Sequence, residues 1–167
     1  MVQARGGGVG DIVRRGYQPA DKQDVFDISN ASGLEPYDIS ELDELFSSWP
    51  EGQHVAYDAE NEKTVGFLSG RIHRPETNRI YMFAVMPGYR SRGIGQLLLD
   101  GFFSLSRDMG SDVILEVRAS NGRARRLYDS NGFVEVCRIS GMYASGEEAV
   151  RMKKEITFIT SNENPDA

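Results

Sequence analysis

The sequence has a single cysteine, Cys137, and only two histidines, His54 and His73, among its 167 residues. One cysteine excludes a disulfide within the chain, and these three residues lack the spacing of a zinc site. Long apolar runs are also missing, because none approaches the roughly 20 residues that a membrane-spanning helix needs. We therefore predict no metal site and no membrane association.

Positive charge is in deficit over the whole chain. Nineteen Lys and Arg residues stand against 25 Asp and Glu residues, for a net charge of -6, so a broad nucleic-acid-binding surface is not expected. The deficit is uneven, since residues 90–126 hold seven arginines and four acidic residues. The acidic remainder can be merely solvated, or it can form an amine-attracting surface beside a cationic ligand pocket. Charge alone leaves both interpretations open.

The length fits one domain with a real core, and 40% hydrophobic with 26% charged residues is typical of a soluble globular protein. We predict a single domain over residues 11–160, preceded by a flexible, glycine-rich tail (1–10) and followed by a polar, disordered tail (161–167). Residues 1–10 have no apolar signal-peptide core, so a cytoplasmic location is expected.

Hydrophobic periodicity predicts strands that alternate with helices in the middle of the chain and pair directly at its ends. The predicted strands are 11–17, 54–58, 64–72, 80–85, 113–118, 133–139 and 149–159. The predicted helices are 19 to about 30, 39–48, the glycine loop to about 108, and 121–130. Residues 80–85 are apolar on both faces, as in a central strand covered by helices on each side. The pattern indicates an α/β (α+β) fold with a mixed sheet of about six or seven strands and about four helices.

The loop Arg90–Gln96 lies between a predicted strand and a predicted helix, and this position favours an anion-binding site. The first amides of a helix have no intrahelical acceptor, the helix dipole adds positive charge, and Gly93 and Gly95 allow close approach to the backbone. Two common nucleotide motifs are excluded. Position 98 is Leu where the dinucleotide fingerprint needs Gly, and the Gly-Lys-Ser/Thr of a phosphate-binding P-loop is missing.

Three polar residues follow the loop at positions that need a partner or a use. Glu116 interrupts an apolar strand on the face of Ile114 and Arg118, where it can pair with an arginine or act chemically. Tyr128 shares a helix face with apolar neighbours, as a core tyrosine does. Asn121 is suited to cap that helix.

The segments Val85–Leu98, Leu115–Asn121 and Ala124–Phe133 together resemble the GNAT superfamily of N-acetyltransferases. Within it they look most like the ribosomal-protein alanine N-acetyltransferases and the archaeal N-terminal acetyltransferases. The resemblance implies the GNAT fold and acetyl-CoA as co-substrate. The residues it assigns to acetyl-CoA are Phe83, Ala84, Val85, Arg90, Ser91, Arg92, Gly93, Ile94, Gly95, Gln96 and Asn121.

In such proteins the backbone amides of the Arg90–Gln96 loop hold the pyrophosphate, and residues 83–85 line the pantetheine arm with the Val85 amide facing the thioester carbonyl. By residue type alone, residues 83–85 are equally suited to the core. Arg125 and Arg126 can reach phosphate groups or face solvent. The resemblance makes Glu116 the general base, directly or through water, and Tyr128 the acid that protonates the leaving thiolate. An α-amine has a pKa of about 7.7 to 8.0 and a phenol one near 10, which suits these roles at neutral pH.

The acceptor implied by the resemblance is a protein N-terminus, acetylated by direct attack in a ternary complex. The loop 141–149 looks like the one that covers peptide N-termini, with Tyr143 as a clamp and Met142 where the family has a second tyrosine. Glu35 and Tyr37 would form the opposing wall, or belong to an ordinary helix–helix loop.

Two other functions remain open from the sequence: acetylation of lysine side chains or small amines, and a non-catalytic acetyl-CoA-binding module. The oligomeric state is also open, because the run 156–160 can extend the last strand or pair with another subunit.

Overall fold

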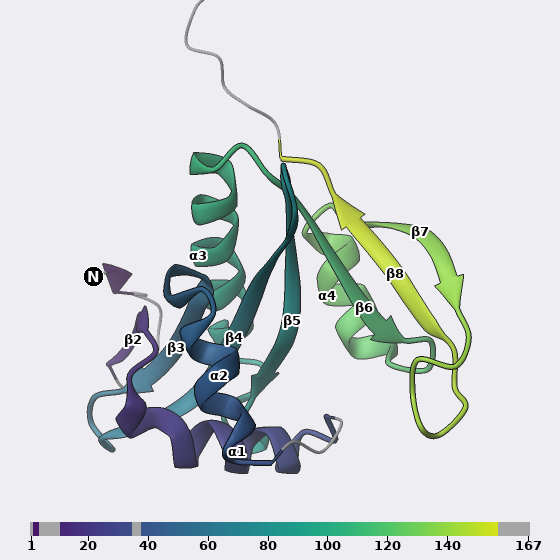
Figure 1. Cartoon of the computed structure of the whole chain (residues 1–167). Helices are drawn as coiled ribbons and strands as arrows, with labels where there is room; N and C mark the ends of the chain where they lie inside the picture. The colour runs from purple at the N-terminus through teal and green to yellow at the C-terminus, as the bar shows by residue number, and fades with distance from the viewer. Residues whose placement is uncertain (1, 4–10, 35–37, 157–167) are drawn as a thin grey trace, which may run out of the picture.

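The computed structural model describes residues 2–3, 11–34 and 38–156 (Figure 1). Its elements follow the predicted order. The helices are α1 (Lys22–Ala31), α2 (Glu41–Ser47), α3 (Ile94–Asp108) and α4 (Gly122–Ser130), with short 3-10 turns η1 (Pro19–Asp21), η2 (Pro50–Gly52) and η3 (Pro87–Tyr89). The strands are β1 (Val2–Gln3), β2 (Ile12–Gly16), β3 (Gln53–Asp58), β4 (Lys63–Arg74), β5 (Thr77–Val85), β6 (Asp112–Arg118), β7 (Val134–Ile139) and β8 (Ala149–Lys154).

The strands form one mixed sheet in the order β1-β2-β3-β4-β5-β6-β8-β7. All neighbours are antiparallel except β5 and β6, which are parallel and are connected through α3. Apart from the two-residue β1, which the sequence did not predict, the sheet has the mixed character and the number of strands expected. None of the helices in the described ranges is long and apolar enough to span a membrane.

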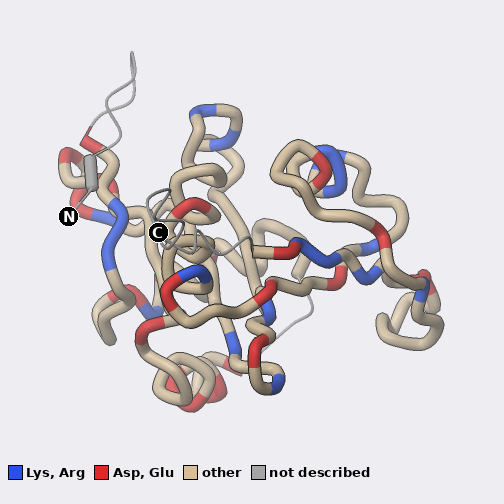
Figure 2. Tube along the Cα trace, turned by 90° about the horizontal axis from the view of Figure 1, so that it is seen from above, with Lys and Arg blue, Asp and Glu red and all other residues tan. Residues whose placement is uncertain are grey.

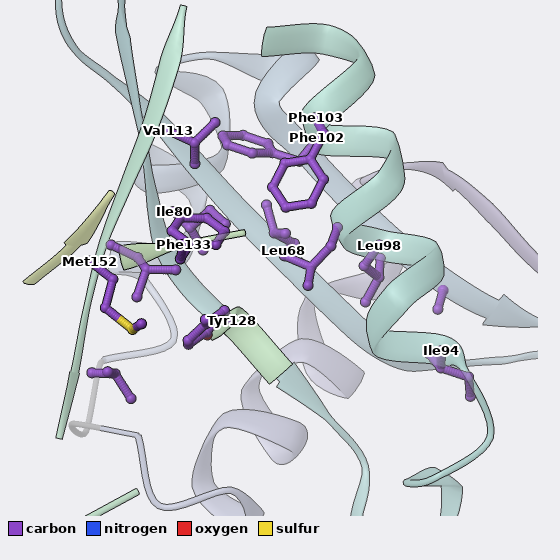
Figure 3. Packing of buried hydrophobic residues seen from close by; sticks show 14 of the residues in the cluster. Leu68, Ile80, Ile94, Leu98, Phe102, Phe103, Val113, Tyr128, Phe133 and Met152 are labelled. Atoms are coloured by element: carbon purple, nitrogen blue, oxygen red, sulfur yellow. The ribbon is translucent and has the colours of Figure 1, made fainter. Parts of the chain in front are cut away.

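Two helical layers cover the sheet (Figure 1). The α3 face carries the larger core, in which Leu98, Phe102 and Tyr128 pack against strand residues such as Leu68 (Figure 3). The opposite face is covered by α1 and α2, whose side chains pack against β3, β4 and β5. As predicted, β5 is therefore covered on both sides near its C-terminal end.

A β-bulge at Tyr81 shifts the side-chain alternation of β5. Ser69 pairs with Met82 but the next residue, Gly70, pairs with Ile80, so Tyr81 is the extra residue. Ile80 consequently lies in the α3-face core, and Met82 lies in the core on the α1 face. Both faces of this strand are apolar in sequence because a helical layer covers each of them, and the bulge decides which side chains reach which layer.

The last strand is shorter than predicted, because β8 ends at Lys154 rather than continuing to residue 159. Ile156 leaves the sheet ladder, and its backbone N–H donates to Asp112 Oδ1 at 3.0 Å. Its side chain is buried in the α3-face core. Residues 157–160, which the sequence offered as a strand extension or subunit contact, lie outside the described residues.

His54 is buried in β3 beside a guanidinium group. Arg14 Nη1 lies 3.0 Å from His54 Nδ1, and since arginine can only donate, Nδ1 is the acceptor and the proton is on Nε2. Gly101 of α3 makes room for this arginine, because a Cβ there would lie 2.4 Å from Arg14 Nε. Burial, and then the charge of Arg14, lower the pKa of His54 to about 4.

We expect the free energy of unfolding to fall by about 2 kcal/mol between pH 7.5 and pH 5 because of His54. The folded pKa is below the unfolded value, so the unfolded chain binds more protons in this window and stability is lost as the pH falls. Urea unfolding at the two pH values measures the difference. The exposed His73 offers a control, since His73→Gln should keep the pH dependence, whereas a flat pH profile of the wild type contradicts the prediction.

Candidate active site

The strands β5 and β6 pair only over their first residues and then separate (Figure 1). Their parallel register runs from Thr77↔Asp112 to Ile80↔Leu115. Beyond that point a cavity of about 520 Å³ opens between β5, β6, the N-terminus of α3 and α4. A gap within an otherwise continuous sheet leaves backbone groups without strand partners, and such groups are free to bind a ligand.

The amide of Val85 points into this gap. Ala84 pairs with Phe67, and the N–H of Met86 donates to Val65 O at 2.8 Å, so these alternate residues face β4. The amide and carbonyl of Val85 must then face the opposite edge of β5. The carbonyl does so, since it accepts a hydrogen bond from Arg90 Nε at 2.9 Å. The Val85 amide therefore faces away from β4, and its role toward a thioester carbonyl stays a prediction.

The loop after β5 delivers the N-terminus of α3 to the mouth of the cavity. Ser91 and Gly93 adopt left-handed φ values of 61° and 79°, and Gly93 is the N-cap residue, with no side-chain hydrogen bond to cap the helix. The first amides of α3 are therefore available to an anion. Gly95 faces Phe83, whose Cζ would lie 3.3 Å from a Cβ at that position. This backbone fits a pyrophosphate group.

Tyr128 projects from α4 into the wall of the cavity, where it is buried. Its ring packs 5.6 Å from that of Phe133 and 6.3 Å from that of Phe83, measured between centroids. Burial, and then the nearby Tyr143 phenol, raise the pKa of Tyr128 above its ordinary value. The hydroxyl is therefore protonated throughout the neutral range and can donate a proton.

Glu116 lines the cavity and lies between two arginines. Arg151 of β8 contacts Oε1 through Nε at 2.8 Å and Nη2 at 2.7 Å, and Arg79 of β5 contacts Oε2 through Nη2 at 2.7 Å. The Glu116 side chain is 4% exposed, while those of Arg79 and Arg151 are 24% and 32% exposed. The arginine pairing that the sequence left open is thus present. Three donors take three of the roughly four acceptor positions of a carboxylate, which leaves space for one water or amine N–H.

The β7–β8 loop (residues 140–148) also contributes to the lining of the cavity. Tyr143 lines the cavity, and Arg118 lies over its ring at 4.0 Å from the centroid. Met142, at the position of the missing second tyrosine, is exposed. Glu35 and Tyr37, predicted for the opposing wall, lie outside the described residues; the neighbouring Leu34 lines the cavity.

Most of the predicted residues converge on this one cavity. Those that line it are Phe83, Ala84, Val85, Arg90, Ser91, Gly93, Ile94, Gly95, Gln96, Glu116, Asn121, Tyr128 and Tyr143. Arg92 is not among them, and its guanidinium lies over the Tyr89 ring at 5.2 Å. The roles of the cavity-lining residues in binding and catalysis stay predictions.

Several of these side chains also have structural partners. Asn121 caps α4 by accepting the Ala124 N–H at 3.1 Å. Gln96 exchanges two hydrogen bonds with Asn131, at 2.8 and 3.0 Å, and so fastens α3 to the end of α4. The Arg90 guanidinium also contacts Ser32 Oγ at 3.1 Å. Their side chains hold the scaffold, which leaves the backbone of the loop to face the ligand.

Two arginines at the site were missed as site residues. Arg123 of α4 lines the cavity and its Nη2 lies 3.3 Å from Ser91 Oγ. Its place two residues after Asn121, on the first turn of a helix, was the available signal. Arg118 was noticed only as a strand neighbour of Glu116. By contrast, Arg125 pairs with Glu135 at 3.2 Å, and it takes no part in lining the cavity.

Charges around the trace are mixed, with Lys and Arg interspersed among Asp and Glu (Figure 2). The cavity itself is bordered by Arg90, Arg118 and Arg123 and by the carboxylate of Glu116. Within the described ranges, no group of three or more His, Cys, Asp or Glu side chains is arranged to hold a metal ion.

Comparison with known proteins places this geometry among acetyltransferases. Residues 22–133 match the model of the acetyltransferase (GNAT) family. A mycothiol acetyltransferase of Mycobacterium sp. (strain MCS) is 29% identical over 142 residues, which cover 76% of this chain and 46% of that protein. N-alpha-acetyltransferase 30 of Xenopus laevis is 31% identical over 124 residues, covering 71% of this chain and 45% of that protein. The chain thus spans less than half the length of these relatives.

Solved structures show the same architecture. Ard1 from Thermoplasma volcanium superposes with a TM-score of 0.83 at 32% identity, over 87% of this chain and 98% of that one. The ribosomal-protein-S18-alanine N-acetyltransferase of Escherichia coli has a TM-score of 0.76 at 24% identity, over 92% of this chain and 97% of that one. The second likeness concerns the fold alone.

Proposed function

The chain belongs to the acetyltransferase (GNAT) family, and on that premise we propose that it transfers the acetyl group of acetyl-CoA to the α-amine of a protein N-terminus. The observation that carries the proposal is the cavity between the separated strands β5 and β6. Its lining includes both the N-terminus of α3, whose first amides are available to an anion, and Tyr143 of the β7–β8 loop. The relatives named N-alpha-acetyltransferase favour an N-terminal acceptor.

In this proposal acetyl-CoA supplies a thioester whose carbonyl carbon the amine attacks. The amide of Val85 donates to the carbonyl oxygen as negative charge develops there. The amine loses a proton through a water held by the remaining acceptor position of Glu116, and Tyr128 gives its proton to the departing sulfur. A new C–N bond forms, the C–S bond breaks, and Tyr128 regains its proton from solvent.

We expect Gly93→Ala to weaken CoA binding about threefold to tenfold. A side chain at a left-handed φ costs about 1–2 kcal/mol, and relief of this strain would rotate the first amides of α3 away from the phosphates. Calorimetric titration with CoA measures the loss. Gly88→Ala is the matched control, since Gly88 lies in the same loop with open space around its Cα and no positive φ. Equal weakening in both variants contradicts the assignment.

The acceptor is tested by a screen of peptides that differ at their first residues, with free lysine and polyamines as competitors. Transfer to peptide α-amines, located by mass spectrometry, supports the proposal. Selective transfer to lysine side chains or polyamines overturns it. Tight CoA binding without transfer to any amine indicates a non-catalytic binding module.

A small-molecule amine is a second candidate acceptor. The observation that favours it is the set of relatives named mycothiol acetyltransferase. One of them is 29% identical over 76% of this chain. Mycothiol-related and other small-molecule amines therefore belong in the same screen. The pH-rate profile also separates acceptor types, because lysine, with a pKa near 10.4, must lose its proton against a larger barrier than an α-amine.

A further inference from the structure

Arg118, the last residue of β6, connects this strand to the β7–β8 loop through its side chain. Its guanidinium lies over the Tyr143 ring at 4.0 Å from the centroid, and its Nη1 donates to Ser145 Oγ at 2.9 Å. The same Nη1 is 3.6 Å from Glu147 Oε2. One side chain therefore contacts three positions of a single loop.

The backbone that follows β6 fastens the same loop. The Ser120 N–H donates to Glu147 Oε1 at 2.8 Å, and the Ala119 N–H donates to Glu148 O at 3.0 Å. The hydrogen bond from Ser120, and then the charge of Arg118, lower the pKa of Glu147. Glu147 is thus ionised at neutral pH and can hold both partners.

The loop buries few of its own side chains. Of residues 140–148, only Tyr143 and Glu147 are half-buried and the other seven are exposed. Both half-buried side chains are contacts of Arg118. Gly141 and Gly146 adopt left-handed φ values of 76° and 78°, so the loop turns sharply at two points without a core of its own. Arg118 thus contacts both half-buried side chains of the loop, and the backbone of Ala119 and Ser120 ties the same loop to the end of β6.

We propose that Arg118 is a positioning residue for the acceptor: it holds the β7–β8 loop so that Tyr143 lies against the cavity, next to Tyr128. The proposal rests on the proposed function, in which the amine approaches from this side. Arg118 sets the affinity for the acceptor through the loop and leaves the chemical step and the binding of CoA to other residues.

Hydrogen exchange tests the structural half of the proposal without any activity. In Arg118→Ala, the hydrogen-bonded amides of Gly146, Ala119 and Ser120 should exchange at least about tenfold faster than in the wild type. Arg138→Ala is the matched control, because it removes an arginine that pairs with Glu135 and with Glu148 of the loop but leaves the contacts of Tyr143, Ser145 and Glu147 with Arg118 in place, so these amides should keep their wild-type exchange. Unchanged exchange in the loop of Arg118→Ala overturns the proposal, whatever the enzyme acetylates.

Steady-state kinetics test the functional half, with the acceptor that the wild type prefers in the screen. We expect Arg118→Ala to raise the acceptor KM about tenfold, which corresponds to about 1.4 kcal/mol, with kcat within about twofold and the Kd for CoA unchanged. Arg118→Lys should recover part of the KM, since lysine keeps the charge and loses the planar contact with Tyr143.

A double-mutant cycle separates positioning from direct contact with the acceptor. Glu147→Gln weakens the contact between Arg118 and the loop from the loop side. Its effect on KM and that of Arg118→Ala should therefore not add. A raised KM in Arg118→Ala without faster loop exchange, or with full additivity in the cycle, means that Arg118 binds the acceptor itself and contradicts positioning. Failure of the wild type to acetylate any peptide contradicts the proposed function. The exchange result still decides whether Arg118 holds the β7–β8 loop.

Discussion

Replacing Tyr128 with phenylalanine is expected to lower kcat about 100-fold or more while the protein stays folded. A positioned general acid contributes about 10²–10⁴ to a rate, and the substitution removes only the hydroxyl. The ring contacts with Phe83 and Phe133 are kept. Because the pKa of Tyr128 is raised by burial, the wild-type rate should show no alkaline loss from this phenol below about pH 10. Measurement of kcat, with circular dichroism melting for the fold, checks both expectations.

Tyr17→Phe is the matched control for this experiment. Tyr17 is a partly buried tyrosine whose ring stacks on Phe46 at 4.1 Å between centroids, in the layer of α2 and away from the cavity. Burial, and then the carboxylates of Asp43 and Asp21, raise the pKa of Tyr17 to about 12. Loss of its hydroxyl should leave kcat unchanged. Similar rates for Tyr128→Phe and the wild type would remove Tyr128 from the mechanism.

The order and type of the elements were predictable because the signals that specify them are local. The α3 stripe of Leu98 and Phe102 and the glycines at 93 and 95 are close in sequence, and they produced the helix and its loop as expected. The bulge at Tyr81 was not predictable in the same way. It depends on a register mismatch with Ser69 and Gly70 on the neighbouring strand, and the strand sequence itself contains no Gly or Pro that signals it.

The residues of the site also differ in how far the sequence could predict them. The loop and the residues lining the cavity were found because each motif is a short stretch. The partners of Glu116 were not, since Arg151 lies 35 residues away and is brought beside it only because β8, rather than β7, pairs with β6. The contact of Arg118 with Ser145 likewise joins residues that are 27 positions apart in the sequence. Pairings of this kind follow from strand order, which one sequence does not specify.

Glu116→Gln is expected to reduce both stability and turnover. Removing the shared carboxylate leaves Arg79 and Arg151 facing each other without compensation. Breaking a fully buried pair costs about 3–5 kcal/mol, and because both arginines are partly exposed we expect about 2 kcal/mol here. Urea unfolding measures this loss. If Glu116 also takes the amine proton through water, kcat per folded molecule should fall about 100-fold.

The comparison with Arg151→Gln separates the two roles of Glu116. That variant keeps the carboxylate and its contact with Arg79 at 2.7 Å, so it should lose stability while kcat per folded molecule stays within about tenfold. Equal losses of kcat in both variants would mean that the rate follows the geometry of the cluster and that Glu116 has no basic role. A loss confined to Glu116→Gln that is relieved at high pH, where the amine is already neutral, is the signature of a base. Because the carboxylate has one acceptor position left, we expect this second result.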